Sequence, residues 1–136
     1  MSIKDKLNYL NFFIQRLQVE TKPEDAPNDG STITSLAFAD PKIVTEKEEK
    51  IAVFPFKFEL RSIDIVISTE FLIGFEIISS ENTNEESLRE LASNNEEFTR
   101  YVNKVLDKIV DNALENTNIR FNDQVSFNSI VYPPKY

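Results

Sequence analysis

The sequence has no cysteine and no histidine, and only two glycines among its 136 residues. Without cysteine, neither disulfides nor thiolate metal sites can form. Without histidine, the chain lacks the commonest metal ligand and the usual general base near neutral pH. The two glycines, Gly30 and Gly74, are too far apart to build a phosphate-binding loop. The composition therefore predicts a protein that is not an enzyme and that holds no metal and no cofactor.

Long apolar runs and an excess of basic residues are also missing. No stretch approaches the roughly 20 apolar residues of a membrane span, and the N-terminal sequence lacks the apolar run and cleavage site of a signal peptide. We therefore expect a cytoplasmic protein that does not enter a membrane. The formal net charge of −8 repels phosphate backbones and anionic lipid surfaces, so nucleic acid is an unfavourable ligand. Basic polypeptide segments would be attracted.

Two acidic clusters are the remaining candidates for a metal site. They comprise Glu46, Glu48 and Glu49, and the pair Glu85 and Glu86. Their spacing matches no known calcium loop. Acidic side chains at a helix start complement the helix dipole, and a charged turn is normally solvated. We therefore interpret both clusters as surface features and predict no metal.

Residues 1–136 are predicted to form a single domain, because 40% of them are hydrophobic and the length suits one core. The first segment has two interpretations. Ile3, Leu7 and Leu10 recur at helical spacing, whereas Leu17 and Val19 would share one face of a strand. We expect a short helix or coil and then a strand over residues 11–21, and the choice for residues 3–18 stays open.

The middle of the chain is rich in strand signals. A loop is predicted over residues 22–31, then strand-like sequence over residues 32–45 with an interruption at Asp40-Pro41, and a charged turn over residues 46–50. Alternating apolar residues predict a strand over residues 51–60 and a longer one up to residue 78, separated by a tight turn or bulge at Arg61-Ser62. Because Pro55 cannot donate a ladder hydrogen bond, its strand is expected to be an edge or to contain an irregularity.

Helical signals follow the strands. Thr83 with Glu86, and Ser93 with Glu96, have the spacing of capping boxes before a short and a long helix, the second ending near Asn116. Strands first and helices last predict an α+β fold: an antiparallel sheet of about four strands (residues 11–78), packed by two C-terminal helices (residues 84–116) and followed by a tail (residues 117–136).

The second face of the predicted sheet is also apolar. It carries Val53, Val66, Leu72 and Ile78 among charged residues. Two apolar faces require either helices on both sides or an oligomer interface. Since the helical sequence suffices for one side, we expect a homo-oligomer, either a dimer or a tetramer.

Several segments, in order along nearly the whole chain, resemble the family of SecB, the bacterial protein-export chaperone. The similar segments are Phe13-Ile14-Gln15-Arg16-Leu17, Asp40-Pro41-Lys42-Ile43-Val44, Glu59-Leu60-Arg61, Phe71-Leu72-Ile73-Gly74-Phe75-Glu76-Ile77 and Val125-Ser126-Phe127-Asn128-Ser129-Ile130-Val131-Tyr132. The chain departs from the family pattern in two connections, at residues 79–84 and 93–95, which lack the family's glycines and proline.

The resemblance implies a four-stranded sheet with two C-terminal helices in a divergent member of the family. It also implies an oligomeric holdase that binds unfolded polypeptides in apolar grooves for protein export and passes them to an export motor protein. The groove residues that it points to are Phe13, Ile14, Leu17, Leu36 and Phe38. The same fold also fits an adaptor dedicated to one partner polypeptide, such as a phage-encoded or toxin–antitoxin-linked protein, and the sequence leaves both functions open.

Overall fold

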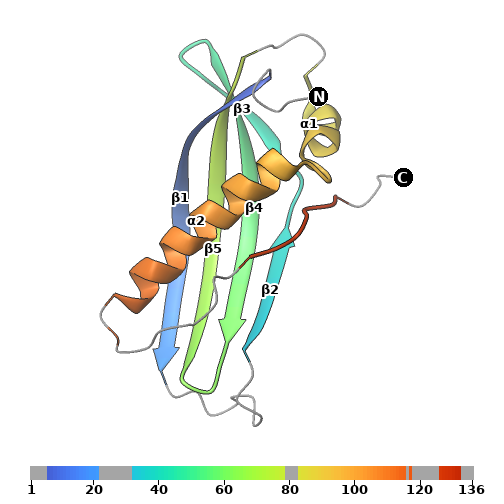
Figure 1. Ribbon diagram of the computed structural model, residues 1–136. Helices are drawn as coiled ribbons and strands as arrows, with labels where there is room; N and C mark the ends of the chain where they lie inside the picture. The colour runs from blue at the N-terminus through green and yellow to red at the C-terminus, as the bar shows by residue number, and fades with distance from the viewer. Residues whose placement is uncertain (1–5, 22–31, 79–82, 116, 118–125, 133–136) are drawn as a thin grey trace.

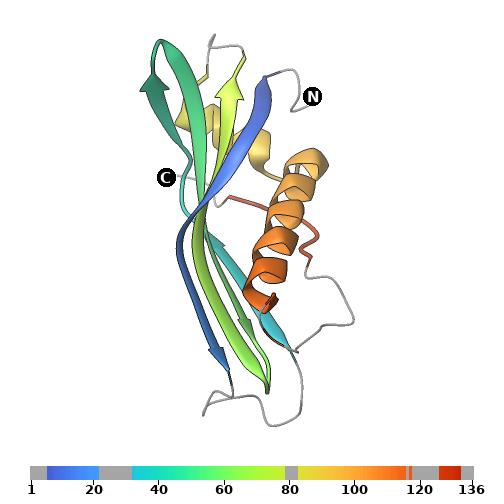
Figure 2. The same ribbon diagram turned by 90° about the vertical axis from the view of Figure 1, so that its left-hand side faces the viewer.

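The chain folds into one antiparallel sheet with two helices on one of its faces (Figures 1 and 2). This computed structural model describes residues 6–21, 32–78, 83–115, 117 and 126–132. Its elements are β1 (Leu7–Thr21), β2 (Ile33–Phe38), β3 (Lys42–Glu46), β4 (Glu49–Arg61), β5 (Ile65–Ile77), α1 (Glu85–Ala92) and α2 (Glu96–Leu114). The predicted α+β class is confirmed, whereas the loop predicted over residues 22–31 lies outside the described residues.

The sheet has five strands rather than about four because its far edge is divided into two short strands. The strand order is β1-β5-β4-β2, and β3 also pairs with β4. β2 reaches Phe56 of β4 and β3 begins opposite Val53, so the two lie end to end along the same neighbour. The break between them contains Asp40-Pro41, where the sequence predicted an interruption.

The same break explains how Pro55 is tolerated in a central strand. Pro55 pairs with Leu72 of β5, and its carbonyl accepts a hydrogen bond from the Ala39 N–H at 3.2 Å. In an antiparallel strand, the N–H and C=O of one residue point to the same neighbour. The missing donor therefore faces the interrupted edge, and the β5 ladder loses nothing. Neither expectation for this strand holds: β4 is central and its register with β5 is unbroken, and the break that accommodates Pro55 lies between β2 and β3.

β4 and β5 form the centre of the core. Along β4 the buried side chains are Ala52, Phe54, Phe56, Phe58 and Leu60, and along β5 they are Ile65, Ile67, Thr69, Phe71, Ile73, Phe75 and Ile77. The ring centroids of Phe54 and Phe98 lie 4.8 Å apart, which identifies this face as the one that α2 covers. The predicted turn at Arg61-Ser62 is tight: the Ser62 N–H donates to the Ile65 carbonyl at 2.9 Å, and the Ser62 hydroxyl oxygen accepts from the Ile65 N–H.

β1 is a strand from Leu7 onward, which settles the choice left open for the described part of residues 3–18. The expected start of the strand at residue 11 is therefore wrong by four residues. Helical spacing was misleading because two bulges interrupt the alternation. The register with β5 shifts between Tyr9 and Asn11 and again between Ile14 and Arg16, so each bulge inserts one extra residue.

The two helices occur where predicted, but both N-caps differ from the prediction. Asn84 caps α1 in a capping box with Ser87, and Asn95 caps α2 by accepting from the Phe98 N–H at 3.0 Å. Asparagine is as good a cap as serine or threonine, so it competes with them for the N-cap position. The observed caps lie one residue after Thr83 and two residues after Ser93. α2 presents a buried stripe that includes Phe98, Val102, Val105, Leu106 and Ile109.

Residues 126–132 cross the helix-covered face without forming a strand or helix (Figure 1). Ile130 and Tyr132 are buried in the main core, and Phe127 packs against it. The predicted tail is therefore a component of the core over residues 126–132. Its Pro133-Pro134 end lies outside the described residues.

Candidate polypeptide-binding surface

Exposed apolar side chains are concentrated on β1. Of the ten large apolar side chains that are exposed among the described residues, five belong to this strand. These five are Leu10, Phe13, Ile14, Leu17 and Val19. A scattered exposed leucine is ordinary for a folded protein, but a cluster on one element marks an interaction site. We refer to these five residues as the β1 surface.

The β1 surface extends over both faces of the sheet. Phe13 lies opposite Leu72, on the face away from the helices, and it is the most exposed of the five, at 58%. Ile14 lies opposite the buried Phe71 and Leu17 opposite the buried Thr69, so both are on the helix-covered face. They are nevertheless 38% and 37% exposed. A partner at this edge would therefore meet apolar groups above and below the plane of the sheet.

β1 also presents unpaired backbone. It is the first strand in the order β1-β5-β4-β2, and among the described residues no strand pairs with its other edge. A free edge carries a row of N–H and C=O groups that can pair with an extended segment. The two bulges divide this edge into three regular stretches, at residues 7–9, 11–14 and 16–21. Bulges disfavour unlimited edge-to-edge pairing, so the edge suits short segments.

The five groove residues predicted from the sequence do not lie together. Phe13, Ile14 and Leu17 belong to β1, whereas Leu36 and Phe38 belong to β2. Two strands separate β1 from β2, so these groups are roughly 14 Å apart across the sheet. Leu36 and Phe38 are half-buried against the core, and the Phe38 ring lies 4.6 Å from that of Tyr132. The prediction thus selected residues of two separate surfaces.

A cavity of about 880 Å³ opens where the helices meet the start of β1. Its lining combines apolar groups such as Leu7, Leu91 and Tyr101 with charges of both signs, including Arg100 and Glu90. Tyr9 stacks on Tyr101 with ring centroids 5.2 Å apart. Burial, with a smaller contribution from Tyr101, raises the pKa of Tyr9 above its ordinary value. The lining therefore offers apolar contacts together with charges of both signs.

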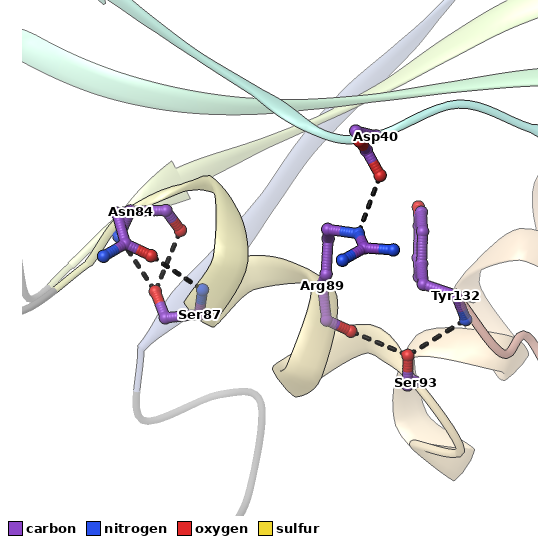
Figure 3. A network of polar contacts seen from close by, with 6 residues as sticks. All are labelled: Asp40, Asn84, Ser87, Arg89, Ser93 and Tyr132. Atoms are coloured by element: carbon purple, nitrogen blue, oxygen red, sulfur yellow. Dashed lines mark hydrogen bonds and ion pairs between the residues drawn. The ribbon is translucent and has the colours of Figure 1, made fainter. Parts of the chain in front are cut away.

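Beside the cavity, a polar network of Asp40, Arg89 and Ser93 holds Tyr132 (Figure 3). Arg89 of α1 is buried, pairs with Asp40 at 2.7 Å, and places its guanidinium 5.8 Å from the Tyr132 ring centroid. The Ser93 hydroxyl donates to the Arg89 carbonyl and accepts from the Tyr132 N–H at 3.1 Å. Sequence reasoning overlooked this network. Its one signal was the arginine beside Leu88 in the buried stripe of α1.

The described part of the chain offers neither a metal-binding cluster nor a membrane-spanning helix. No group of three or more acidic, histidine or cysteine side chains there is placed to hold a metal ion. No helix there is long and apolar enough to cross a membrane.

Comparison with known proteins gives structural neighbours but no sequence relatives. No protein-family model matches the chain, and no curated protein matches it. One similar solved structure is the SecB-like chaperone of Mycobacterium tuberculosis in complex with a ChAD peptide from the HigA1 antitoxin, with 13% identity, a TM-score of 0.49, and coverage of 98% of this chain and 96% of that one. Another is a protein of unknown function from Streptococcus agalactiae, with 12% identity, a TM-score of 0.43, and coverage of 86% and 97%.

Proposed function

We propose that this protein is a SecB-like holdase that captures extended, non-native polypeptide segments on the β1 surface. The observation that carries the proposal is the concentration of exposed apolar side chains on a strand whose outer edge is unpaired among the described residues. Backbone pairing gives affinity for any extended chain, and the apolar side chains on both faces add affinity for unfolded clients. The resemblance of the sequence to SecB supports the same function.

The proposal extends to the setting of the activity. A cytoplasmic protein of net charge −8 would favour clients with basic stretches, and an export motor protein is a suitable recipient of such clients. A homo-oligomer would bring several β1 surfaces to one client and increase avidity. The alternative function, an adaptor for one partner polypeptide, uses the same surface with a narrower client range.

The test is a refolding assay with an unrelated protein that folds slowly. A stoichiometric amount of the unaltered chain should delay refolding of this client. The double variant Phe13→Asp/Leu17→Asp removes one apolar group from each face of β1 and should bind the client about tenfold less tightly or worse, since each lost apolar contact is worth roughly 1 kcal/mol or more. Both positions are exposed, so the fold should remain.

The matched control is the double variant Ile63→Asp/Ile78→Asp. These two isoleucines are 52% and 55% exposed and flank β5 outside any strand. This variant should delay refolding as well as the unaltered chain does. If both double variants retain full capture, β1 is not the client surface. If the unaltered chain delays no unrelated client even in excess, the general holdase is excluded and the single-partner adaptor takes its place.

A further inference from the structure

Residues 126–132 lie on the helix-covered face in the way that a bound peptide lies in a receptor. Three side chains point into the protein: Phe127 meets Phe58 edge-on, with centroids 6.3 Å apart, Ile130 is 2% exposed, and Tyr132 is 7% exposed. The side chains between them, Asn128, Ser129 and Val131, are exposed. We call residues 126–132 the tail segment.

The backbone of the tail segment is held at each of these three anchor positions. The Asn103 side chain donates to the Phe127 carbonyl at 3.0 Å and accepts from the Phe127 N–H at 2.9 Å. The Asn94 N–H donates to the Ile130 carbonyl at 2.8 Å, and the Tyr132 N–H donates to the Ser93 hydroxyl oxygen at 3.1 Å. None of these four hydrogen bonds involves a side chain of the tail segment. They would form equally with another sequence in the same extended conformation.

The receptor side belongs to other parts of the chain. Asn103 projects from α2, Ser93 and Asn94 connect the helices, and Phe38 and Phe58 come from β2 and β4. We call these five residues the tail groove. Within the part of the chain that the structure describes, the tail segment pairs with no strand, and three of its side chains contribute to the apolar core. A segment of another protein that supplies the same three anchors would therefore recover the four backbone hydrogen bonds and the three apolar contacts.

We propose that the tail groove is a second peptide-binding site, occupied in the free protein by the chain's own tail segment. Its external ligand is an extended segment of another polypeptide with the pattern aromatic–x–x–aliphatic–x–aromatic, as in Phe127, Ile130 and Tyr132. A tethered segment competes at an effective concentration on the order of millimolar. The tail therefore excludes weak segments and yields only to a ligand that binds better or is locally abundant. The inference does not depend on the β1 surface.

The test uses the full chain and a fluorescent synthetic peptide of residues 126–132. The double variant Phe127→Ala/Ile130→Ala weakens the tail segment and leaves all five residues of the tail groove unchanged. It should bind the peptide at least about tenfold more tightly than the unaltered chain, because the tethered competitor is lost. A control variant, Asn128→Ala/Ser129→Ala, changes only exposed tail positions and should bind like the unaltered chain. A peptide lacking the Phe and Ile side chains should not bind.

Two outcomes of this titration would overturn the proposal. One is a folded double variant whose affinity for the peptide equals that of the unaltered chain. The other is a chain that is dimeric when unaltered and monomeric in the double variant, because the tail groove would then hold the tail of a second copy and not the chain's own. The variant Phe13→Asp/Leu17→Asp should bind the peptide as the unaltered chain does, so failure of the tail groove and failure of the β1 surface are distinguishable.

A second measurement decides the matter if the double variant does not fold. Val131 is 49% exposed, and the chain has no cysteine, so a Val131→Cys variant can carry a single nitroxide label. Excess unlabelled peptide should displace the tail segment and sharpen the spectrum of the label. An unchanged spectrum at a peptide concentration well above millimolar would refute the displacement.

Discussion

Tyr132 combines a favourable ring environment with an unfavourable one for its hydroxyl. The ring contacts Phe38 and the Arg89 guanidinium, whereas the hydroxyl is buried and has no hydrogen-bond partner among the described residues. Burial raises the pKa of Tyr132 far above its ordinary value of 10.0, the charge of Asp40 raises it further, and Arg89 lowers it in part. A buried donor without a partner costs roughly 1–3 kcal/mol. Within the Tyr132 side chain, it is therefore the ring and not the hydroxyl that helps to hold the tail segment in place.

The variant Tyr132→Phe tests this division. At pH 7 it should unfold with a free energy about 1 kcal/mol higher than the unaltered chain, because the unpartnered hydroxyl is removed. Above pH 10 the difference should widen: the unfolded tyrosine ionises there while the folded one stays neutral, so the unaltered chain loses stability that the variant does not. Urea denaturation between pH 7 and 11 measures both effects. Parallel loss of stability in the two chains would contradict them.

The β3–β4 hairpin is closed by two residues that the geometry disfavours. Lys47 and Glu48 have φ angles of 49° and 70°, and they connect the paired residues Glu46 and Glu49. A two-residue turn with two positive φ angles is the one that Asn-Gly forms best, since side chains larger than asparagine's are strained there. The charged run over residues 46–50 therefore forms the turn, as predicted, but its two central residues fit the backbone conformation of that turn poorly.

Replacing the turn by Lys47→Asn/Glu48→Gly should raise the free energy of unfolding by about 1 kcal/mol, measured by chemical denaturation. The control is Glu49→Gly, the same replacement at the first residue of β4, where φ is not positive. Glycine in a strand costs conformational entropy without relieving strain, so the control should lower stability by a similar amount. Stabilisation by both variants would mean that charge removal, and not backbone conformation, is responsible.

Sequence patterns located most elements because those elements are locally determined. Alternation from Ala52 to Ile77 predicted the central strands, and the apolar spacing from Phe98 to Leu114 predicted α2, because each period directly reflects one buried face. The same reasoning failed at β1, where two bulges break the period, and at residues 126–132, which have no period. Periodicity says nothing about which strands become neighbours, so the distance between Phe13 on β1 and Phe38 on β2, both taken from the family resemblance, could not be judged from the sequence.

At the scale of the whole molecule, a second apolar surface lies beside the β1 surface, on the sheet face that no described helix covers. On the sheet face opposite the helices, an outer stripe runs across β3, β4 and β5 through Val44, Ile51, Val53, Pro55 and Leu72. Beyond it the same face carries paired charges, Lys57 with Glu70 at 3.8 Å and Arg61 with Glu59. The whole sheet face, made by β1, β5, β4 and the end-to-end pair β2 and β3, spans roughly 800 Å². Each partner buries about that area in an interface of standard size. This supports the proposed homo-oligomer, with sheets packed face to face.

Sedimentation of a concentration series tests this assembly. The unaltered chain should sediment at twice its 15.7 kDa, and Val44→Asp, which places a charge in the outer stripe, should sediment as a monomer. The control Ile63→Asp charges a side chain of similar exposure outside the stripe, 52% against 47%, and should remain dimeric. Two copies of charge −8 repel each other, and salt screens that repulsion over about 10 Å at 0.1 M. Added salt should therefore tighten a dimer held by apolar contact, whereas it would weaken a dimer held by ion pairs. If salt dissociates the dimer, the interface does not lie on the outer stripe.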